Sequence, residues 1–583
     1  MEISSIQPSS LANRVWDTPT AARDVAAAGL RQSLGISQEL ADILASRGME
    51  DPGLAREFLS PSESQLLPPM LMLGMGDAVQ RIISAVTRYE KILVVGDYDV
   101  DGTASASIFY NYMRRLGAHI QFYIPHRLTD GYGLNRANIA RYKQWGVDLL
   151  VSTDQGSTEV EGAMALEREG IELIIADHHQ LGREKPRCVA MINPQQKDCP
   201  YPFKGLSAAG VVYKLIQALD EALTAQNFWD TRGVRRTSPS YYLDLVALAT
   251  VADMSPLVGE NRTLVRLGLE AINSNPRPGV SGLIKECRVR GDVSPTSISF
   301  KLAPKINALG RIGDPGLAVQ LFNCHSHTEA RKLARVLVST NQKRQVIERR
   351  VFDLAMDQVE SNGGGPGCVL AGEDWHPGVI GSIATRVSFS IKKPTVVLTL
   401  QDKPHAVGSA RGWNGFNVLA ALGACESLLD RFGGHPAAAG LSMQQSQVGA
   451  FAKGFNEAVE RVNGQNVPVN EPLRIDAWVR PEAITETLLD EVARLSPFGY
   501  CNPEPVLAMR NVRMENLMVF HKRHLKFRLM ADEAQPLEAV AWEKSDWAIA
   551  PDTRYDVAFM PQRQLGPRGT FTQLKILDCI PVG

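Results

Sequence analysis

The sequence predicts an α/β protein in which a domain with a parallel sheet and a second α/β domain are joined by a long helix, with a small β-barrel after them. Short apolar runs that alternate with amphipathic stretches predict the parallel sheet. A stretch at 328–360 has apolar residues at helical spacing and neither Gly nor Pro, which predicts the long helix. Short alternating runs from about residue 468 onward predict the barrel. At 583 residues the chain is long enough for three or four domains of roughly 150 residues each.

The parallel sheet is predicted from five nearly continuous apolar runs between residues 91 and 194. Helical stretches such as 103–117 and 158–170 separate the first four of them. Strands that alternate with amphipathic helices form a parallel sheet that is covered on both faces. Right-handed crossovers place the carboxyl ends of the strands along one edge, where open α/β sheets bind ligands. The chemistry of this domain is therefore expected at its strand ends.

Changes in pattern divide the chain into five parts. Residues 1–75 are interpreted as a helical adaptor region whose role stays open. Residues 76–327 contain the predicted parallel sheet and residues 328–360 the connecting helix. Residues 361–467 form the second α/β domain, and residues 468–583 form the barrel.

Composition narrows the class of protein. A hydrophobic content of 44% and a charged content of 21% are typical of a globular chain. A net charge of -1 neither supports nor excludes a nucleic-acid partner, so only a local basic surface could indicate one. The eight cysteines form no C-x-x-C pair and are expected to be reduced. There is no secretory signal and no apolar stretch of roughly 18 residues, so we expect a cytoplasmic protein without a membrane partner.

Acidic and imidazole side chains follow several of the apolar runs. They are, in chain order, Asp97, Asp99, Asp154, Asp177, His178, His179 and Asp253. Four segments therefore deliver them to what we expect to be one edge of one sheet. Carboxylates a few ångströms apart repel one another, and divalent cations relieve that repulsion. Carboxylate oxygens with an imidazole nitrogen suit Mn²⁺ or Mg²⁺, and two such ions roughly 3.5–4 Å apart can cleave a phosphoester.

Each of these residues also has a simpler explanation when it is taken alone. A D-x-D pair after a strand most often caps the next helix. The DHH stretch could be a capping Asp with two surface histidines, and Asp253 could be an ordinary turn residue. Only their recurrence after successive apolar runs favours a metal site.

These residues carry a resemblance to the DHH phosphoesterase superfamily. The ordered motifs are GDYDVDG (96–102), an Asp after the next-but-one strand, DHH (177–179) and ATVADMSPL (249–257). Within the superfamily the chain is similar to the bacterial exonucleases that are specific for single-stranded DNA. Further similar stretches extend over roughly residues 75–583: IPHRLTDGYGLN (124–135), KINALGRIGDP (305–315), WHPGVIGSIATR (375–386), GSARG (408–412), GGHPAAAGL (433–441) and PFGYCNPEPVL (497–507).

The resemblance implies a DHH domain and a DHHA1-type domain joined by a long helix, followed by an OB-like barrel. It also implies that two Mn²⁺ or Mg²⁺ ions are held by five side chains. These are Asp97, Asp99, Asp154, His178 and Asp253. His179 would be a further catalytic-site residue, either as a ligand or in positioning the phosphate.

Asp101 and Gln155 lie beside predicted ligands in the sequence but are not themselves predicted ligands. Asp101 is left outside the ligand set and is expected to fix the glycine turn and the start of a helix at Thr103. Relatives usually read TVDNG where this chain reads STDQGS (152–157). The aspartate is kept, but Gln155 could alter the geometry around it.

The second α/β domain offers a different chemistry. GSARG provides Ser409 and Arg411, and a hydroxyl, a forked guanidinium and backbone amides suit a terminal phosphate. The resemblance implies that this position binds the 5′-phosphate end, with contributions from Arg127 and Arg311, and that His435 faces the nucleotide. Taken alone, each Arg is more often a surface ion-pair partner.

The barrel contains one basic stretch, VFHKRHLKFRL (519–529), in which Phe520 and Phe527 lie among six basic or imidazole residues. It is either a solvated strand face or a platform for single-stranded DNA, with cations along the backbone and rings that stack on bases.

The resemblance thus implies a monomeric exonuclease that degrades single-stranded DNA from its 5′ end to mononucleotides by two-metal hydrolysis, in recombination and repair. Single-strand binding protein and a helicase are the partners that it implies. One alternative is a phosphodiesterase of the same superfamily that acts on short oligoribonucleotides or cyclic dinucleotides, but such enzymes generally lack the barrel. The other is a non-enzymatic scaffold, but such relatives lose the metal ligands, and all five are present here.

Overall fold

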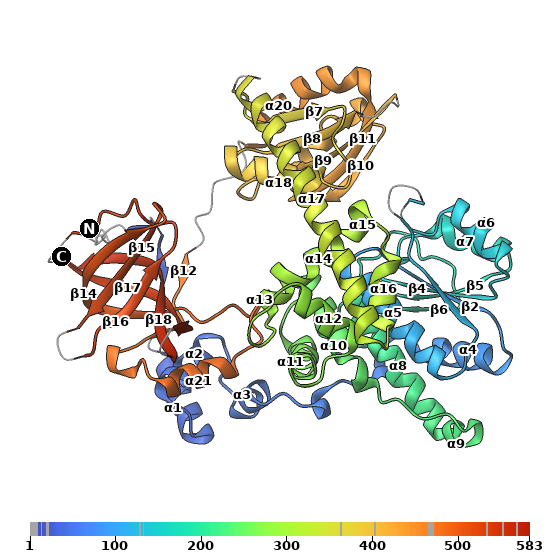
Figure 1. Ribbon diagram of the computed structural model, residues 1–583, viewed down its shortest axis with the longest axis horizontal. Helices are drawn as coiled ribbons and strands as arrows, with labels where there is room; N and C mark the ends of the chain where they lie inside the picture. The colour runs from blue at the N-terminus through green and yellow to red at the C-terminus, as the bar shows by residue number, and fades with distance from the viewer. Residues whose placement is uncertain are drawn as a thin grey trace. The chain divides into compact units, whose positions relative to one another are not determined.

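The structure is a computed structural model, and two compact units make it up (Figure 1). It describes residues 10–12, 14–18, 22–126, 130–131, 133–361, 364–400, 404–463, 472–531, 534–550, 553–566 and 569–582. One unit, the core unit, comprises Leu67–Ser255 and Gly259–Val469. The other, the terminal unit, comprises Met1–Leu66, Pro256–Val258 and Asn470–Gly583.

The core unit begins with the predicted parallel sheet. Its strands, in spatial order, are β3 (Ile120–Tyr123), β2 (Ile92–Gly96), β4 (Leu149–Thr153), β5 (Glu172–Ala176) and β6 (Ala190–Ile192). All neighbours are parallel, and every residue of β2 and β4 is buried. The order reverses at β2, which pairs with both β3 and β4. Ligands of open α/β sheets bind outside the carboxyl ends at such a reversal, so the ends of β2 and β4 are the expected site.

Helices cover both faces of this sheet. On one face, α6 (Arg136–Gln144) and α7 (Val160–Arg168) share a core with β2, β4 and β5. On the other, α5 (Val100–Arg115) packs on β2, and α8 (Ala208–Ala225) and α10 (Leu243–Ala252) pack on α5. Further helices of this part are α4 (Met75–Thr87), α9 (Phe228–Arg232), α11 (Gly259–Ser274), α12 (Pro278–Glu286), α14 (Ala303–Asn307), α15 (Leu309–Ile312) and α16 (Gly316–Asn323).

The predicted connecting helix is one continuous helix, α17 (His327–Ser361), of 35 residues. It leads to a second sheet, which α17 and α18 (Ile380–Ile391) cover on one face (Figure 1). Helices α19 (Val418–Gly423) and α20 (Val448–Asn463) cover the other face. Its strands, in spatial order, are β10 (Arg431–His435), β11 (Ala438–Gln444), β9 (His405–Arg411), β8 (Thr395–Leu400) and β7 (Cys368–Gly372). Only β7 and β8 are parallel.

The terminal unit contains the expected barrel. Its strands are β13 (Ala477–Trp478), β14 (Leu507–Phe520), β15 (His524–Met530), β16 (Leu537–Ala541), β18 (Gly569–Val582) and β17 (Arg554–Gly566), in spatial order. A further pairing of β14 with β17 closes the sheet on itself. Buried residues alternate along β15, with Leu525, Phe527 and Leu529 facing the interior. The α/β fold with two sheets, a connecting helix and a barrel is therefore confirmed.

The N-terminal helices belong structurally to this barrel, which the sequence does not indicate. Helices α1 (Ala22–Leu34), α2 (Gln38–Ser46) and α3 (Pro52–Leu59) share one hydrophobic core with the barrel strands. Strand β1 (Trp16–Asp17) pairs with β12 (Leu473–Arg474). The buried carboxylate of Asp578 accepts hydrogen bonds from the Ala12 amide at 2.8 Å and the Trp16 indole at 2.9 Å. The first part of the chain is thus held to the last part by both core packing and hydrogen bonds.

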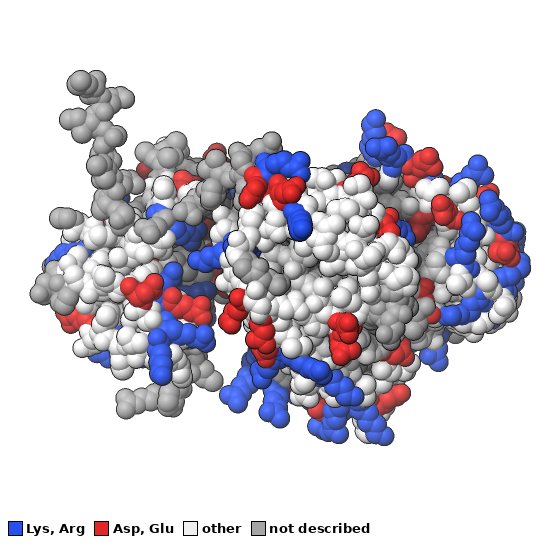
Figure 2. All heavy atoms as spheres, turned by 90° about the horizontal axis from the view of Figure 1, so that it is seen from above, with Lys and Arg blue, Asp and Glu red and all other residues white. Residues whose placement is uncertain are grey.

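The surface agrees with the balanced charge of the sequence. Figure 2 shows basic and acidic residues interspersed, with uncharged areas between them, on the face that it presents. Among the described residues, no helix combines the length and the apolarity needed to cross a bilayer.

Candidate active site

The turn after β2 places Asp97 and Asp99 at the sheet edge. Asp99 is the N-cap of α5, and its carboxylate accepts a hydrogen bond from the Gly102 amide at 3.1 Å. A Cβ at Gly102 would lie 2.5 Å from the backbone N and O of Asp97, so only glycine permits this turn. Asp154 follows the adjacent strand β4 with φ 61, a left-handed conformation that Asp tolerates better than most residues. Carboxylate oxygens of Asp97, Asp99 and Asp154 lie within 4.8 Å of one another.

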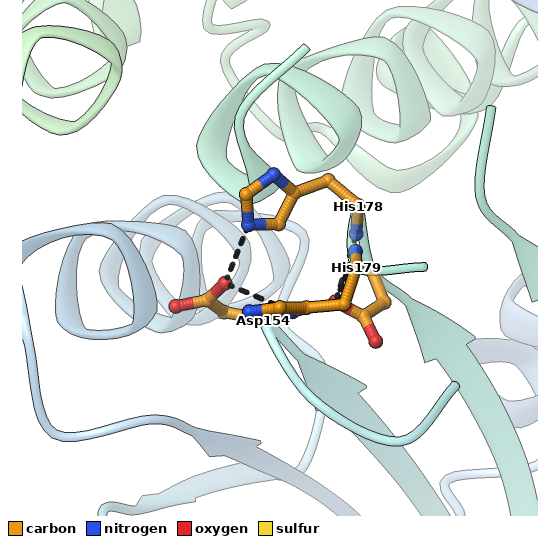
Figure 3. Close-up of side chains that lie close together, drawn as sticks. Asp154, His178 and His179 are labelled. Carbon is orange, nitrogen blue, oxygen red and sulfur yellow. Dashed lines mark hydrogen bonds and ion pairs between the residues drawn. The ribbon is translucent and has the colours of Figure 1, made fainter. Parts of the chain in front are cut away.

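The DHH stretch follows β5 and brings two imidazoles to the same edge (Figure 3). The Nε2 atom of His178 lies 3.2 Å from Oδ1 of Asp154, and the Nδ1 atom of His179 lies 3.9 Å from the same oxygen. Asp177 is buried and holds this turn, because its carboxylate accepts hydrogen bonds from the amides of Ser157, His178 and His179. Asp177 is therefore a positioning residue that the motif spacing alone did not assign.

Asp253 reaches the cluster from a helix. The apolar run before it was expected to end at the sheet edge like the others, but it forms α10, and Asp253 is the C-cap of that helix. A purely apolar run of this length does not distinguish a buried strand from a buried helix, which explains the error. The Oδ2 atom of Asp253 lies 3.9 Å from Nδ1 of His178 and accepts a hydrogen bond from the Ser255 hydroxyl at 2.7 Å. The structure thus gathers all five predicted ligands, here called the acidic cluster: Asp97, Asp99, Asp154, His178 and Asp253.

The acidic cluster contains buried polar atoms that lack hydrogen-bond partners among the described residues. Oδ1 of Asp154 and Nε2 of His178 are both buried, and neither has a hydrogen-bond partner of acceptable geometry among the described residues. They lie 3.2 Å apart and face each other as a close pair (Figure 3), but without the geometry of a hydrogen bond. An unsatisfied buried polar atom is costly, and a cation removes that cost. The donor set of carboxylate oxygens and one imidazole nitrogen fits Mn²⁺ or Mg²⁺.

Burial also shifts the pKa values of the cluster. Desolvation and the neighbouring carboxylates raise the pKa of Asp99 and raise that of Asp154 well above its ordinary value. Burial lowers the pKa of His178, which keeps its imidazole neutral and able to act as a ligand. A hydrogen bond to Asp177, at 2.8 Å between Nδ1 and Oδ1, raises the pKa of His179 to about 9. The two imidazoles therefore differ in charge at neutral pH.

The expected role of Asp101 is wrong. Asp99, not Asp101, caps the helix that follows the glycine turn. The buried carboxylate of Asp101 instead accepts hydrogen bonds from the amides of Ala208 and Ala209, at 2.7 and 2.8 Å, at the start of α8. Burial raises the pKa of Asp101 well above its ordinary value, and its Oδ2 lies 3.8 Å from Nε2 of His178. Asp101 thus connects α8 to the acidic cluster.

Gln155, at the position where relatives usually have Asn, is a buried residue. Its side chain is 2% exposed, and Nε2 has no hydrogen-bond partner among the described residues. The Ser152 hydroxyl donates to the Gln155 carbonyl at 2.8 Å and fixes the backbone of this turn. The substituted position therefore lies next to Asp154 with a donor that no described protein group uses.

A second site lies on the second sheet. Ser409 and Arg411 are alternate residues of β9, so both side chains lie on one face. A Cβ at Gly381, in the first turn of α18, would lie 3.0 Å from Nη2 of Arg411 and 3.4 Å from Oγ of Ser409. The first turn of a helix presents unpaired backbone amides, so hydroxyl, guanidinium and amides converge.

Arg311 approaches the same turn from the first part of the core unit. Its Nη1 donates to the carbonyl of Gly378 at 3.1 Å, two residues before α18 begins. We call Ser409, Arg411, Arg311 and the first turn of α18 the anion site, because its donors suit a phosphate.

His435 lies in register with Arg411. Both pair with Ala438, from the two sides of β11, so their side chains lie on one face with a small residue between them. A Cβ added at Gly433 or Gly440 would meet nothing within 4 Å, which leaves this part of the sheet open to a ligand. Arg127 lies outside the described residues.

Only some side chains of the basic stretch of the barrel are free to contact a DNA strand. Phe527 is 1% exposed and belongs to the barrel core, so of the two interpretations of this stretch, the platform does not hold for this ring. Lys526 and Arg528 both form ion pairs with Glu538. Phe520 and His521 of the stretch pack against each other, and Trp542, which is 46% exposed, joins them with its ring centroid 5.6 Å from that of Phe520. Trp542 was missed because it lies on a separate segment.

Three family models match the chain. The DHH family N-terminal domain matches residues 91–250, the DHHA1 domain residues 364–461 and the RecJ OB domain residues 475–578. The single-stranded-DNA-specific exonuclease RecJ of Escherichia coli (strain K12) is 32% identical over 523 residues, which are 88% of this chain and 89% of that protein. The chain belongs to the RecJ family. The resemblance inferred from the motifs is therefore confirmed, and the family is one of single-stranded-DNA-specific exonucleases.

Other RecJ proteins extend the comparison. RecJ of Bacillus subtilis (strain 168) is 34% identical over 91% of this chain, and the chain spans 66% of the length of that relative. The crystal structure of RecJ from Thermus thermophilus in complex with Mn²⁺ has a TM-score of 0.80 and 26% identity, over 97% of this chain and 79% of that one. The complex with Mg²⁺ has a TM-score of 0.75 and 25% identity, over 98% and 78%.

Proposed function

We propose that this RecJ-family protein degrades single-stranded DNA in the 5′→3′ direction to mononucleotides by two-ion hydrolysis. One observation supports the proposal: a partly buried acidic cluster and an anion site with two guanidinium groups lie in the same compact unit. The first suits divalent cations and the second suits a terminal phosphate. A strand held by its terminal phosphate presents the next phosphodiester, and cleavage there removes one nucleotide.

The acidic cluster is assigned as the site of two Mn²⁺ or Mg²⁺ ions, the metals named for RecJ of Thermus thermophilus. The residues of the cluster fit these ions because buried carboxylate and imidazole atoms lack hydrogen-bond partners among the described residues. When bound, two such ions supply an activated water and stabilise the leaving oxygen.

His179 is assigned to the phosphate rather than to an ion. With Nδ1–H donated to Asp177, the imidazolium has Nε2–H left to donate to a non-bridging phosphate oxygen. Its pKa of about 9 keeps it cationic at neutral pH, which favours an anionic partner over a metal. Asp177 stays ionised, because its pKa is lowered below the ordinary value.

The reaction balances as a simple hydrolysis. The water oxygen forms a new bond to phosphorus while the bond from phosphorus to the 3′-oxygen breaks. The 3′-oxygen leaves with the bonding electron pair and takes up a proton. The products are a 5′-mononucleotide and a strand that carries a new 5′-phosphate, so each cycle regenerates the group that the anion site binds.

The anion site is assigned to the 5′-phosphate. Arg411 and Arg311 would contribute charge, and Ser409 a hydroxyl, to an anion at the first turn of α18. His435 faces the open part of the same sheet, where a nucleotide would lie. Arg127 keeps its predicted place in this site as a proposal.

The barrel is assigned to single-stranded DNA further along the strand. Phe520, His521 and Trp542 offer rings for stacking, and Lys522 and Arg523 are exposed beside them. Single-strand binding protein and a helicase are proposed partners, since they present or generate such strands. We also propose that the protein is a monomer and is located in the cytoplasm. The division of the chain into five parts, with boundaries at residues 76, 328, 361 and 468, belongs to the same proposal.

A digestion assay tests the proposal. Purified protein would be incubated with Mn²⁺ or Mg²⁺ and with 5′- or 3′-labelled strands, single or double, and separately with a dinucleotide. We expect single strands to release labelled mononucleotide from the 5′ end first. Release from the 3′ end, or faster hydrolysis of the dinucleotide than of the long strand, would overturn it.

A further inference from the structure

Three glycines make close contacts along the path from the turn that carries Asp97 and Asp99 to the anion site. The first is Gly310 of α15, which packs directly on Tyr98, the residue between the two aspartates. A Cβ at Gly310 would lie 2.6 Å from the Tyr98 ring and 2.8 Å from the Tyr98 carbonyl oxygen. Real Cβ atoms essentially never approach so closely, so no other residue fits without movement of the metal turn.

The other two glycines continue the contact to the anion site. A Cβ at Gly378 would lie 2.3 Å from the carbonyl oxygen of Arg311, the residue that follows Gly310 in the chain. A Cβ at Gly381 would lie 3.0 Å from Arg411 and 3.4 Å from Ser409. We call Gly310, Gly378 and Gly381 the glycine series.

Each step of this path is either covalent or a direct packing contact. A hydrogen bond of 3.0 Å from the Val100 amide to Oδ1 of Asn307 adds a second connection at the first step. None of the three glycines has a left-handed φ, so what they supply is space and not conformational freedom. At the first two steps the contacted atoms include backbone, which cannot rotate away as the end of a side chain can.

We infer that the glycine series fixes the distance between the anion site and the acidic cluster, and with it the length of the released product. The inference rests on the proposed function, since it needs a bound 5′-phosphate and a cleaved phosphodiester. Close-packed backbone transmits a displacement instead of absorbing it. A strand anchored at one end is then cut at the phosphodiester that this distance places over the metals.

Alanine substitution of one of these glycines should push apart the two segments that it joins and so change the distance between the two sites. Gly378→Ala requires a displacement of about 1 Å between Arg311 and the turn before α18 to reach ordinary contact. The metal turn is not touched, so Mn²⁺ affinity should stay within about twofold of the unsubstituted protein. A displacement of about 1 Å in a positioned substrate can lower the rate by about 100-fold.

The experiment measures the length of the first product. Strands with a labelled 5′-phosphate would be cut by the full chain, and the ratio of dinucleotide to mononucleotide would be read at early times. Calorimetry with Mn²⁺ alone would report metal affinity. Gly449→Ala is the matched control, because this helical glycine of α20 has nothing within 4 Å of its Cβ position.

For Gly378→Ala we expect the dinucleotide-to-mononucleotide ratio to rise about tenfold and the preference for 5′-phosphate over 5′-hydroxyl to fall about tenfold. Gly310→Ala should shift product length and, unlike Gly378→Ala, also weaken Mn²⁺ binding, because it displaces Tyr98. Gly449→Ala should match the unsubstituted protein in all three measurements.

If Gly378→Ala does not fold, Gly381→Ala gives the same test with a smaller displacement. Its neighbours are side-chain ends that can move by a few tenths of an ångström, so folding is preserved and a rise of about threefold in the ratio is expected. A purely mononucleotide product from a folded, slower variant would overturn the inference. Failure of the unsubstituted protein to release any 5′-nucleotide would instead overturn the proposed function.

Discussion

The acidic cluster and the anion site lie in one unit and are built in opposite ways. In the cluster, Oδ1 of Asp154 and Nε2 of His178 are buried and lack hydrogen-bond partners among the described residues. In the anion site, Nη1 of Arg411 already donates to the Ser409 hydroxyl at 2.7 Å and to the Ala410 carbonyl at 2.8 Å. A cation completes the first site, whereas a phosphate must replace hydrogen bonds that already exist in the second. Substitution of one acid of the cluster should therefore cause a severe loss of activity. Substitution of one arginine of the anion site should cause a partial loss.

The strongest test of this contrast is Asp154→Asn. Its carboxylate belongs to two of the candidate metal groups, so the substitution removes a charge that no neighbour replaces. We expect hydrolysis of single-stranded DNA to fall by at least about 1,000-fold and Mn²⁺ affinity to fall with it. Nuclease assays and calorimetry measure the two effects.

Asp148→Asn is the matched control, since Asp148 is an exposed Asp just before the same strand and should leave both values unchanged. Full activity of Asp154→Asn would contradict the assignment of the acidic cluster.

The graded side of the contrast is tested by Arg411→Ala. A charged hydrogen bond to phosphate contributes about 1.5–3 kcal/mol, so the rate on 5′-phosphorylated strands should fall about 10- to 100-fold. The rate on 5′-hydroxyl strands and the affinity for Mn²⁺ should change little, because the acidic cluster is not touched. Rate measurements on the two strands separate these effects.

Arg331→Ala, at an exposed ion pair with Glu286, is the control. An equal loss on both strands would show that Arg411 does not read the terminal phosphate.

The smallest expected effect is a pH dependence of the stabilisation by Mg²⁺. Burial raises the pKa of Asp99 and Asp154, so the metal-free folded chain binds protons that the unfolded chain has released. Its stability therefore falls as pH rises from the ordinary carboxyl range through the raised pKa values. A bound ion replaces those protons, so Mg²⁺ should raise Tm by a few degrees more at about pH 8 than at about pH 6.

Thermal unfolding with Mg²⁺ or with a chelator measures this difference, and Asp154→Asn should abolish most of it. An equal Mg²⁺ shift at both pH values would argue against buried, proton-binding ligands.

Sequence reasoning succeeded where local pattern and chain order carry the information. Apolar runs located the strands of the first sheet, three strands of the second sheet (β7, β8 and β9) and the barrel, and the absence of Gly and Pro located α17. Strands β10 and β11 were not located, because they are short and rich in small residues. It failed where a run is apolar throughout, as before Asp253, because periodicity then does not separate strand from helix. It left the side of the strand on which Phe527 lies undecided, because that side depends on register.

The sequence alone predicts the kinds of chemistry in this protein. Acids and imidazoles after successive apolar runs predicted a metal site, and Ser409 with Arg411 between glycines predicted an anion site. Which groups meet is visible in the folded chain alone. The tertiary structure assigned the helix cap to Asp99 and the start of α8 to Asp101, and it joined the N-terminal helices to the barrel core. The reason is physical: hydrogen bonds and core contacts between residues hundreds of positions apart depend on packing, and no local pattern records them.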